Sequence, residues 1–202
     1  MGAMRTVIMV SVLTIVGLGT GCGSPTEGAP VADHNCVETS VPLTLVSPQS
    51  EAEPELRVPQ PAGWETSDEL TSALTRFAMV NTDLTAQGFA PNALVTFEAI
   101  TGESSDADQV FNQQREVLER QLGATAVSTE SGLQCGYPAQ TISYTAPVMG
   151  NVPERQSKVL CVLADVDGTN YLTTLTLSTV DPGNGTYTRD SADILAGFQV
   201  NG

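Results

Sequence analysis

Residues 155–179, RQSKVLCVLADVDGTNYLTTLTLST, contain two runs of apolar and β-branched residues on either side of Asp167-Gly168. Such residues favour strands. An Asp-Gly pair between two strands is a strong signal for a two-residue hairpin, because both residues of that turn need a positive φ angle. The sequence therefore predicts two antiparallel strands, at 155–166 and 169–179.

The hairpin turn also predicts the register, with Val166 opposite Thr169 and Leu163 opposite Leu172. Successive strand side chains point to opposite faces, so the residues separate into two sets. One face carries Leu160, Val162, Ala164, Tyr171, Thr173 and Leu175. The other carries Val159, Cys161 and Leu163. Because both faces are apolar, we expect the sheet to be covered on both sides.

The flanking sequence predicts further strands and two helices. Strands are expected at 56–58, 75–82, 93–100 and 125–146, and helices at 106–122 and about 189–198. This order predicts an α+β fold, an antiparallel β-sheet sandwiched by helices (α/β/α). The only Trp, Trp64, is expected to be a core anchor rather than an exposed ligand platform.

The ends of the first helix carry capping signals. Ser105 can cap its start with Asp108 as the capping-box acid, and Gly123 fits the position just after its end. For the second helix, Thr188 or Ser191 is the expected cap. The intervening segment 182–185, Pro-Gly-Asn-Gly, is expected to form a turn, because it lacks the Lys-Ser/Thr of a phosphate-binding loop.

The N-terminus has the pattern of a bacterial lipoprotein signal peptide. Arg5 precedes an apolar run at 7–18, and the small residues 19–21 precede Cys22. The run is too short for a membrane-spanning helix, which needs about 20 apolar residues. We expect residues 1–21 to be removed and Cys22 to receive the lipid (palmitate among its acyl chains). An ordinary secretory signal, with Cys22 incidental, is the alternative.

The remaining chain is strongly acidic. The formal net charge is −15, and all 23 acidic residues follow residue 21. Nucleic acid is an improbable partner, since binding its phosphates needs a basic surface. Attachment to the outer face of the cell membrane would come from the lipid. Residues 22–55, rich in Pro, Ser, Thr and Glu, are expected to be a flexible tether, and 56–202 a single globular domain.

Three cysteines remain besides Cys22. Cys135 and Cys161 lie symmetrically about the expected turn at 147–150, so we predict that they form a disulfide. Cys36 is then left over, free or cross-linked to another molecule. No metal site is expected, because the chain has no CxxC motif and its one histidine, His34, lies in the predicted tether.

No catalytic site is predicted. A Ser/His/Asp arrangement needs a rigidly held histidine, and the G-x-S-x-G motif of hydrolases is absent from the sequence. No cofactor is implied. The leading hypothesis is a binding domain for an envelope protein or glycolipid. A lipid carrier with an apolar cavity is the main alternative, and a hydrolase is the third.

Three stretches resemble a known family. LRVPQPAGW at 56–64, LVTF at 94–97 followed by DADQV at 106–110, and DILAGF at 193–198 resemble, in this order, the actinobacterial LpqN/LpqT lipoproteins. The resemblance implies a Mog1/PsbP-like fold and a non-catalytic lipoprotein of the mycobacterial type of cell envelope. It also implies a role in envelope lipid handling and the binding of protein partners.

Overall fold

The computed structural model describes residues 36–101 and 106–202, and within them the chain forms two antiparallel sheets. The large sheet has the strand order β3-β4-β5-β9-β8-β7-β6, and the small sheet has the order β1-β2-β10. The large sheet consists of β3 (Glu65–Thr66), β4 (Thr75–Val80), β5 (Asn92–Ala99), β6 (Thr125–Gln134), β7 (Tyr137–Ala146), β8 (Arg155–Val166) and β9 (Thr169–Thr179). The small sheet consists of β1 (Leu43–Val46), β2 (Glu55–Pro59) and β10 (Gln199–Asn201).

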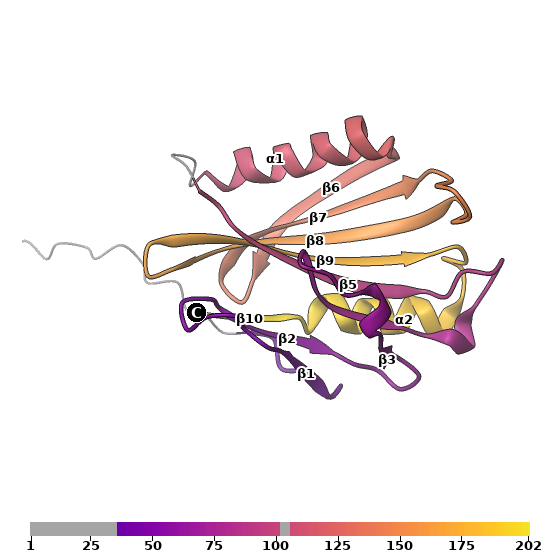
Figure 1. Ribbon diagram of the computed structural model, residues 1–202, viewed down its shortest axis with the longest axis horizontal. Helices are drawn as coiled ribbons and strands as arrows, with labels where there is room; N and C mark the ends of the chain where they lie inside the picture. Colours follow the sequence, from indigo (N-terminus) through magenta and orange to yellow (C-terminus); the bar gives the residue numbers. More distant parts are fainter. Residues whose placement is uncertain (1–35, 102–105) are drawn as a thin grey trace, which may run out of the picture. The chain divides into compact units, whose positions relative to one another are not determined.

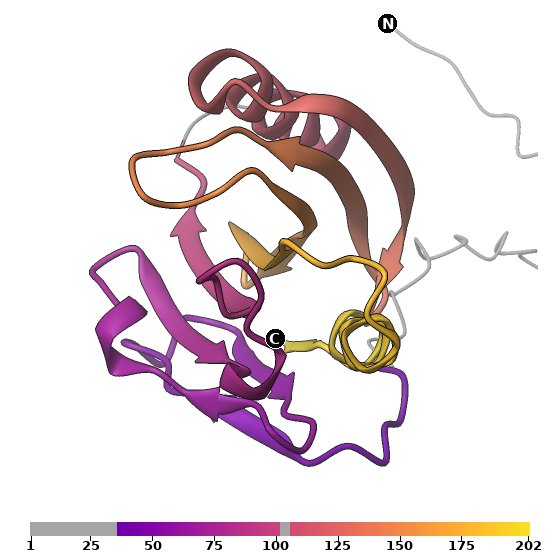
Figure 2. The ribbon, with the colours of Figure 1, turned by 90° about the vertical axis from the view of Figure 1, so that its right-hand side faces the viewer.

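Helices lie on both faces of the large sheet (Figure 1). Helix α1 (Ala107–Val117) covers one face, and α2 (Gly185–Ala196) lies with the small sheet on the other. Figure 2 shows α2 end-on, beside the strands. The short helical turns are η1 (Asp68–Leu70), η2 (Thr82–Leu84) and η3 (Leu118–Leu122). The predicted class, an antiparallel sheet between helices, is confirmed. The three-stranded sheet was not predicted.

The β8–β9 hairpin has the predicted register. Val166 pairs with Thr169 and Leu163 with Leu172. Both turn residues, Asp167 and Gly168, have positive φ angles of 51° and 80°, as this type of turn requires.

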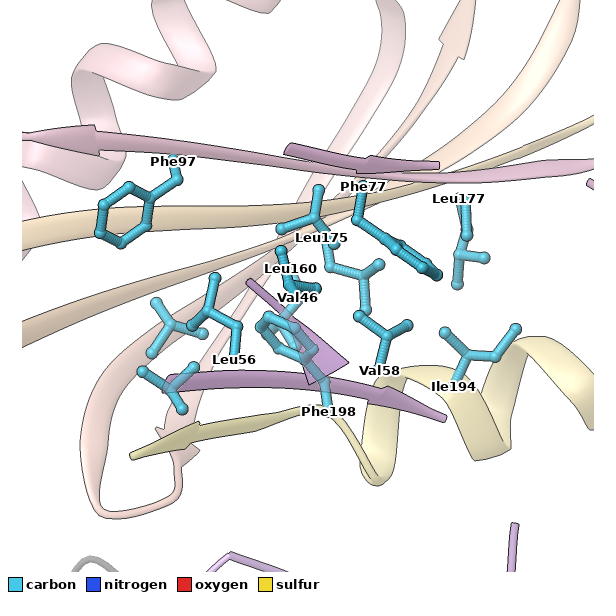
Figure 3. Close-up of a cluster of buried hydrophobic side chains, with 14 of the residues drawn as sticks. Val46, Leu56, Val58, Phe77, Phe97, Leu160, Leu175, Leu177, Ile194 and Phe198 are labelled. Carbon is cyan, nitrogen blue, oxygen red and sulfur yellow. The ribbon is translucent and has the colours of Figure 1, made fainter. Parts of the chain in front are cut away.

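The two faces of the large sheet carry separate hydrophobic cores. The core under α1 is built on Val110 and Phe111 of the helix, which pack with Ile142, Val159, Cys161, Leu163 and Leu172. The larger core joins the opposite face to α2 and the small sheet (Figure 3). Its members include Leu56, Val58, Phe77, Leu160, Leu175, Leu177, Ile194 and Phe198. Trp64 belongs to this core and is 2% exposed, as predicted.

The start of α1 differs from its prediction by one residue. Asp106, not Ser105, is the N-cap, and its side chain accepts a hydrogen bond from the Gln109 amide at 3.1 Å. After Val117 the chain continues as the π-helical turn η3, which ends at Gly123 in the left-handed conformation (φ 76°). The prediction that Gly123 follows the end of the helix is therefore confirmed.

Helix α2 begins four residues before its predicted start. Asn184 is the N-cap, and its Oδ1 accepts hydrogen bonds from the Thr186 and Tyr187 amides at 3.0 and 3.1 Å. The capping signal therefore lies inside the segment interpreted as a turn. Thr188 and Ser191, the predicted caps, are inside the helix and donate their hydroxyl protons to backbone carbonyls.

The predicted tether at 22–55 extends too far into the domain. Strand β1, at 43–46, pairs along its whole length with β2. Its Val46 is buried in the larger core. Residues 36–55 of the predicted tether are therefore part of the described domain, and residues 22–35 lie outside the described residues.

The predicted Cys135–Cys161 disulfide is wrong. Cys135 is bonded to Cys36, and Cys161 is a buried free thiol. The β7–β8 register places Gln140 opposite Cys161, while Cys135 lies in the turn between β6 and β7. The two side chains also belong to different cores, Cys135 to the α2 side and Cys161 to the α1 side, so the sheet separates them.

Candidate functional site

A groove of about 410 Å³ lies between α2 and the large sheet. Its volume is in the range of small-molecule sites. We call it the α2 groove. Its lining residues are Ser143, Gln156, Ser157, Lys158, Thr179, Pro182, Tyr187, Thr188, Ser191 and Ala192.

The sheet side of the α2 groove is polar because the side chains on this face of strands β7, β8 and β9 change from apolar to polar. On β8, Leu160 is in the larger core, but Lys158 and Gln156, two and four positions earlier on the same face, line the groove. Ser143 pairs with Lys158, and Thr179 pairs with Gln156, so strands β7 and β9 add hydroxyls on either side. This break in the apolar alternation was readable in the sequence, and our prediction did not use it.

The helix side of the α2 groove is one face of α2. Tyr187 and Ser191 are four residues apart, as are Thr188 and Ala192, so all four lie along the same stripe of the helix. The Asn184 cap fixes where this stripe begins.

A buried polar contact holds α2 against the rest of the domain. The Trp64 indole Nε1 donates a hydrogen bond to Asp190 Oδ2 at 3.0 Å, and Asp190 is 3% exposed. The other oxygen, Oδ1, accepts from Arg189 at 3.0 Å. The predicted core Trp therefore also positions the helix that forms one wall of the groove.

Tyr187 is the aromatic residue of the α2 groove. The residue is 7% exposed, and its ring belongs to the larger core. Within the described part of the chain its hydroxyl has no hydrogen-bond partner, and burial raises the pKa of this phenol. The hydroxyl stays protonated at neutral pH and is available as a donor.

A second hollow of about 430 Å³ adjoins the α2 groove. Gln156 and Pro182 line both, and Arg155 lines only the second. The Arg155 guanidinium lies 5.9 Å from the Phe89 ring centroid. The two hollows together line the start of β8.

The residues singled out from the sequence do not form a catalytic site. Cys22 and His34 lie outside the described residues. Cys161 is fully buried, and burial raises the pKa of its thiol to about 12, which leaves no reactive thiolate at neutral pH. In residues 36–101 and 106–202, no group of three or more His, Cys, Asp or Glu side chains could hold a metal ion. Neither of the helices described there is long and apolar enough to span a membrane.

The family assignment rests on a match over most of the sequence. The profile of the family described as "probable lipoprotein LpqN" matches residues 30–201. The chain belongs to the LpqN lipoprotein family. The resemblance predicted from three short stretches is thus confirmed. No curated protein sequence matches the chain.

A solved LpqN structure shares the fold. The crystal structure of LpqN involved in cell envelope biogenesis of Mycobacterium tuberculosis matches with a TM-score of 0.64 and 16% sequence identity, covering 81% of this chain and 93% of the other. The Saccharomyces cerevisiae Ran-binding protein Mog1p matches more weakly. Its TM-score is 0.46 at 13% identity, with 80% and 96% of the two chains covered.

Proposed function

We propose that the protein is a non-catalytic lipoprotein of the cell envelope that binds an envelope glycolipid in the α2 groove. The observation that carries this proposal is the composition of the groove. The sheet side supplies hydroxyl and amide groups. Across from it lie the aromatic ring of Tyr187 and the apolar side chains of Pro182 and Ala192, together with the hydroxyls of Thr188 and Ser191. A sugar needs several hydrogen-bonding groups, and an acyl chain needs apolar surface, so a groove with both kinds of lining suits an amphiphile.

Membership of the LpqN family supports an envelope location. The Mycobacterium tuberculosis structure is described as involved in cell envelope biogenesis. We propose that Cys22 carries a lipid and holds the domain at the outer face of the cell membrane. Only 13 residues lie between Cys22 and Cys36 in the sequence, so the chain between them can reach at most about 50 Å. The groove would thus work close to the membrane surface.

The packing of the interior favours lipid binding in a surface groove over binding in an enclosed cavity. The two hydrophobic cores pack against both faces of the large sheet. Close-packed cores of this kind leave little room for a long acyl chain. We therefore favour binding at the surface over the carrier alternative.

Native mass spectrometry tests groove binding. The secreted Cys22→Ala chain, which carries no lipid of its own, is incubated with an envelope extract and purified again. We expect one bound lipid per chain, lost when Ala192→Trp fills the groove. Ala196→Trp is the matched control, because it places the same side chain at an exposed position one turn further along α2, outside the groove. The absence of bound lipid, or its retention in Ala192→Trp, would contradict the proposal.

The anchor has its own test. Metabolic labelling with a fatty-acid analogue should mark the native chain and leave Cys22→Ala unlabelled. Equal labelling of both would refute lipidation at this cysteine, without bearing on the groove.

A further inference from the structure

The positive charges of this acidic protein are distributed unevenly. Of the seven basic side chains in the described residues, five form ion pairs with carboxylates. These pairs are Arg57 with Glu55, Arg76 with Glu53, Arg115 with Glu119, Arg120 with Glu116, and Arg189 with Asp190. The remaining two, Arg155 and Lys158, have no carboxylate partner within the described part of the chain. Both lie at the start of β8 and line the two adjoining hollows.

Lys158 is the only lysine of the sequence, which has 23 acidic residues. No acidic side chain lines the α2 groove with it. An ammonium group left without a carboxylate in a chain of net charge −15 provides a local positive potential, and concave walls strengthen such a potential. The charge of the groove is therefore opposite to that of the protein as a whole.

Uncharged donors accompany the ammonium group. The Tyr187 hydroxyl lies at the groove without a hydrogen-bond partner within the described residues, and Ser143 and Thr179 add hydroxyls on the sheet side. A neutral sugar would use the hydroxyls and leave the Lys158 charge unused. An oxyanion accepts hydrogen bonds from both kinds of donor and also gains the charge interaction.

We propose that the ligand of the α2 groove carries an oxyanion, a carboxylate or a phosphate, bound by the Lys158 ammonium group with the Tyr187 hydroxyl as a second donor. This inference rests on the proposed function, because it specifies the polar end of the amphiphile that the groove binds. The apolar part of the ligand lies along Tyr187, Pro182 and Ala192.

Calorimetric titration of the secreted Cys22→Ala chain separates the chemistries. Three probes are compared below their micellar concentrations: octyl phosphate, octyl glucoside and inorganic phosphate. The same titrations use Lys158→Gln and the matched control Arg57→Gln, which also removes one positive charge but lies on β2 outside the groove.

We expect octyl phosphate to bind more tightly than octyl glucoside, and Lys158→Gln to weaken its binding about tenfold, as the loss of one partly exposed charged hydrogen bond predicts. Arg57→Gln should leave the affinity unchanged. Tighter binding of octyl phosphate than of inorganic phosphate would identify a lipid headgroup as the source of the oxyanion, and equal binding a free phosphate. Either result supports the oxyanion site, but equal binding would contradict the apolar part of the ligand and, with it, the proposed amphiphile.

Two outcomes would overturn the inference, and they differ in what they say about the proposed function. If octyl glucoside binds as well as octyl phosphate and neither responds to Lys158→Gln, the oxyanion site is refuted while the groove remains a glycolipid site. If neither amphiphile binds, both proposals fail.

Discussion

The Cys36–Cys135 disulfide closes a loop with a sequence separation of 99 residues. In the chain-entropy description, a cross-link closing a loop of this length stabilises the folded state by about 4.7 kcal/mol. For a domain of this size each kcal/mol corresponds to roughly 2–4 °C in melting temperature. Reduction, or the substitution Cys36→Ser, should therefore lower the melting temperature by about 10–20 °C.

Thermal unfolding followed by circular dichroism, with and without reductant, measures this effect. Reductant should lower the melting temperature of the native chain and, by a similar amount, that of Cys161→Ala, whose disulfide is intact. It should have no effect on Cys36→Ser. Peptide mapping without reduction should recover Cys36 linked to Cys135. A reductant effect that disappears in Cys161→Ala, or a mapped peptide containing Cys161, would refute the pairing.

Two further predictions concern buried groups. Trp64→Phe removes the hydrogen bond to the buried Asp190 carboxylate and should lower the free energy of unfolding in urea by about 1–3 kcal/mol. Arg189→Gln removes only the mostly exposed partner and should cost less than about 1 kcal/mol; equal losses would contradict the burial argument. Burial raises the pKa of Cys161 from 9.0 to about 12, so the unfolded thiol ionises first and stability should fall between those pH values. The urea midpoint of Cys161→Ala should then fall less steeply above pH 9 than that of the native chain, and parallel curves would show that the thiol does not contribute.

Local signals predicted the β8–β9 hairpin, because the Asp167-Gly168 turn sets the register and the alternation sets the faces. The disulfide could not be inferred in the same way. Two residues placed symmetrically about a turn are paired only if the centre of that turn is known to within one residue. The prediction used residue 148 as the centre, and the β7–β8 hairpin is centred further along the chain. Cys36 also lies outside the strands and is 99 residues from Cys135, so no local pattern links the two.

The small sheet was missed because two of its strands are short and its pairing is non-local. Strand β10 has three residues and pairs with β2, about 140 positions earlier. Residues 43–46, Leu-Thr-Leu-Val, have strand propensity, but the Ser, Glu and Pro of the segment after them led us to interpret the whole region as a tether. Pairing with β2 and burial of Val46 stabilise this short strand in the fold.

The α2 groove was accessible to sequence reasoning only in part. Gln156 and Lys158 are polar at positions that continue the apolar face of β8, and this break is visible in the sequence. Tyr187 lies over the same region only because α2 begins at Gly185. Asn184, which caps this helix, was interpreted as part of a turn, so the position of Tyr187 was not predicted. The groove requires both pieces of information.

Lys158, the only lysine of the sequence, offers a direct probe of binding in the α2 groove. Reductive methylation with ¹³C-formaldehyde places one dimethyl-lysine signal in the groove, at Lys158, separate from the signal of the terminal amine. Titration of the secreted Cys22→Ala chain with octyl phosphate should shift this signal and saturate at one ligand per chain, and Ala192→Trp should abolish the shift. An unchanged Lys158 signal in a titration for which calorimetry records binding would show that the ligand binds outside the α2 groove.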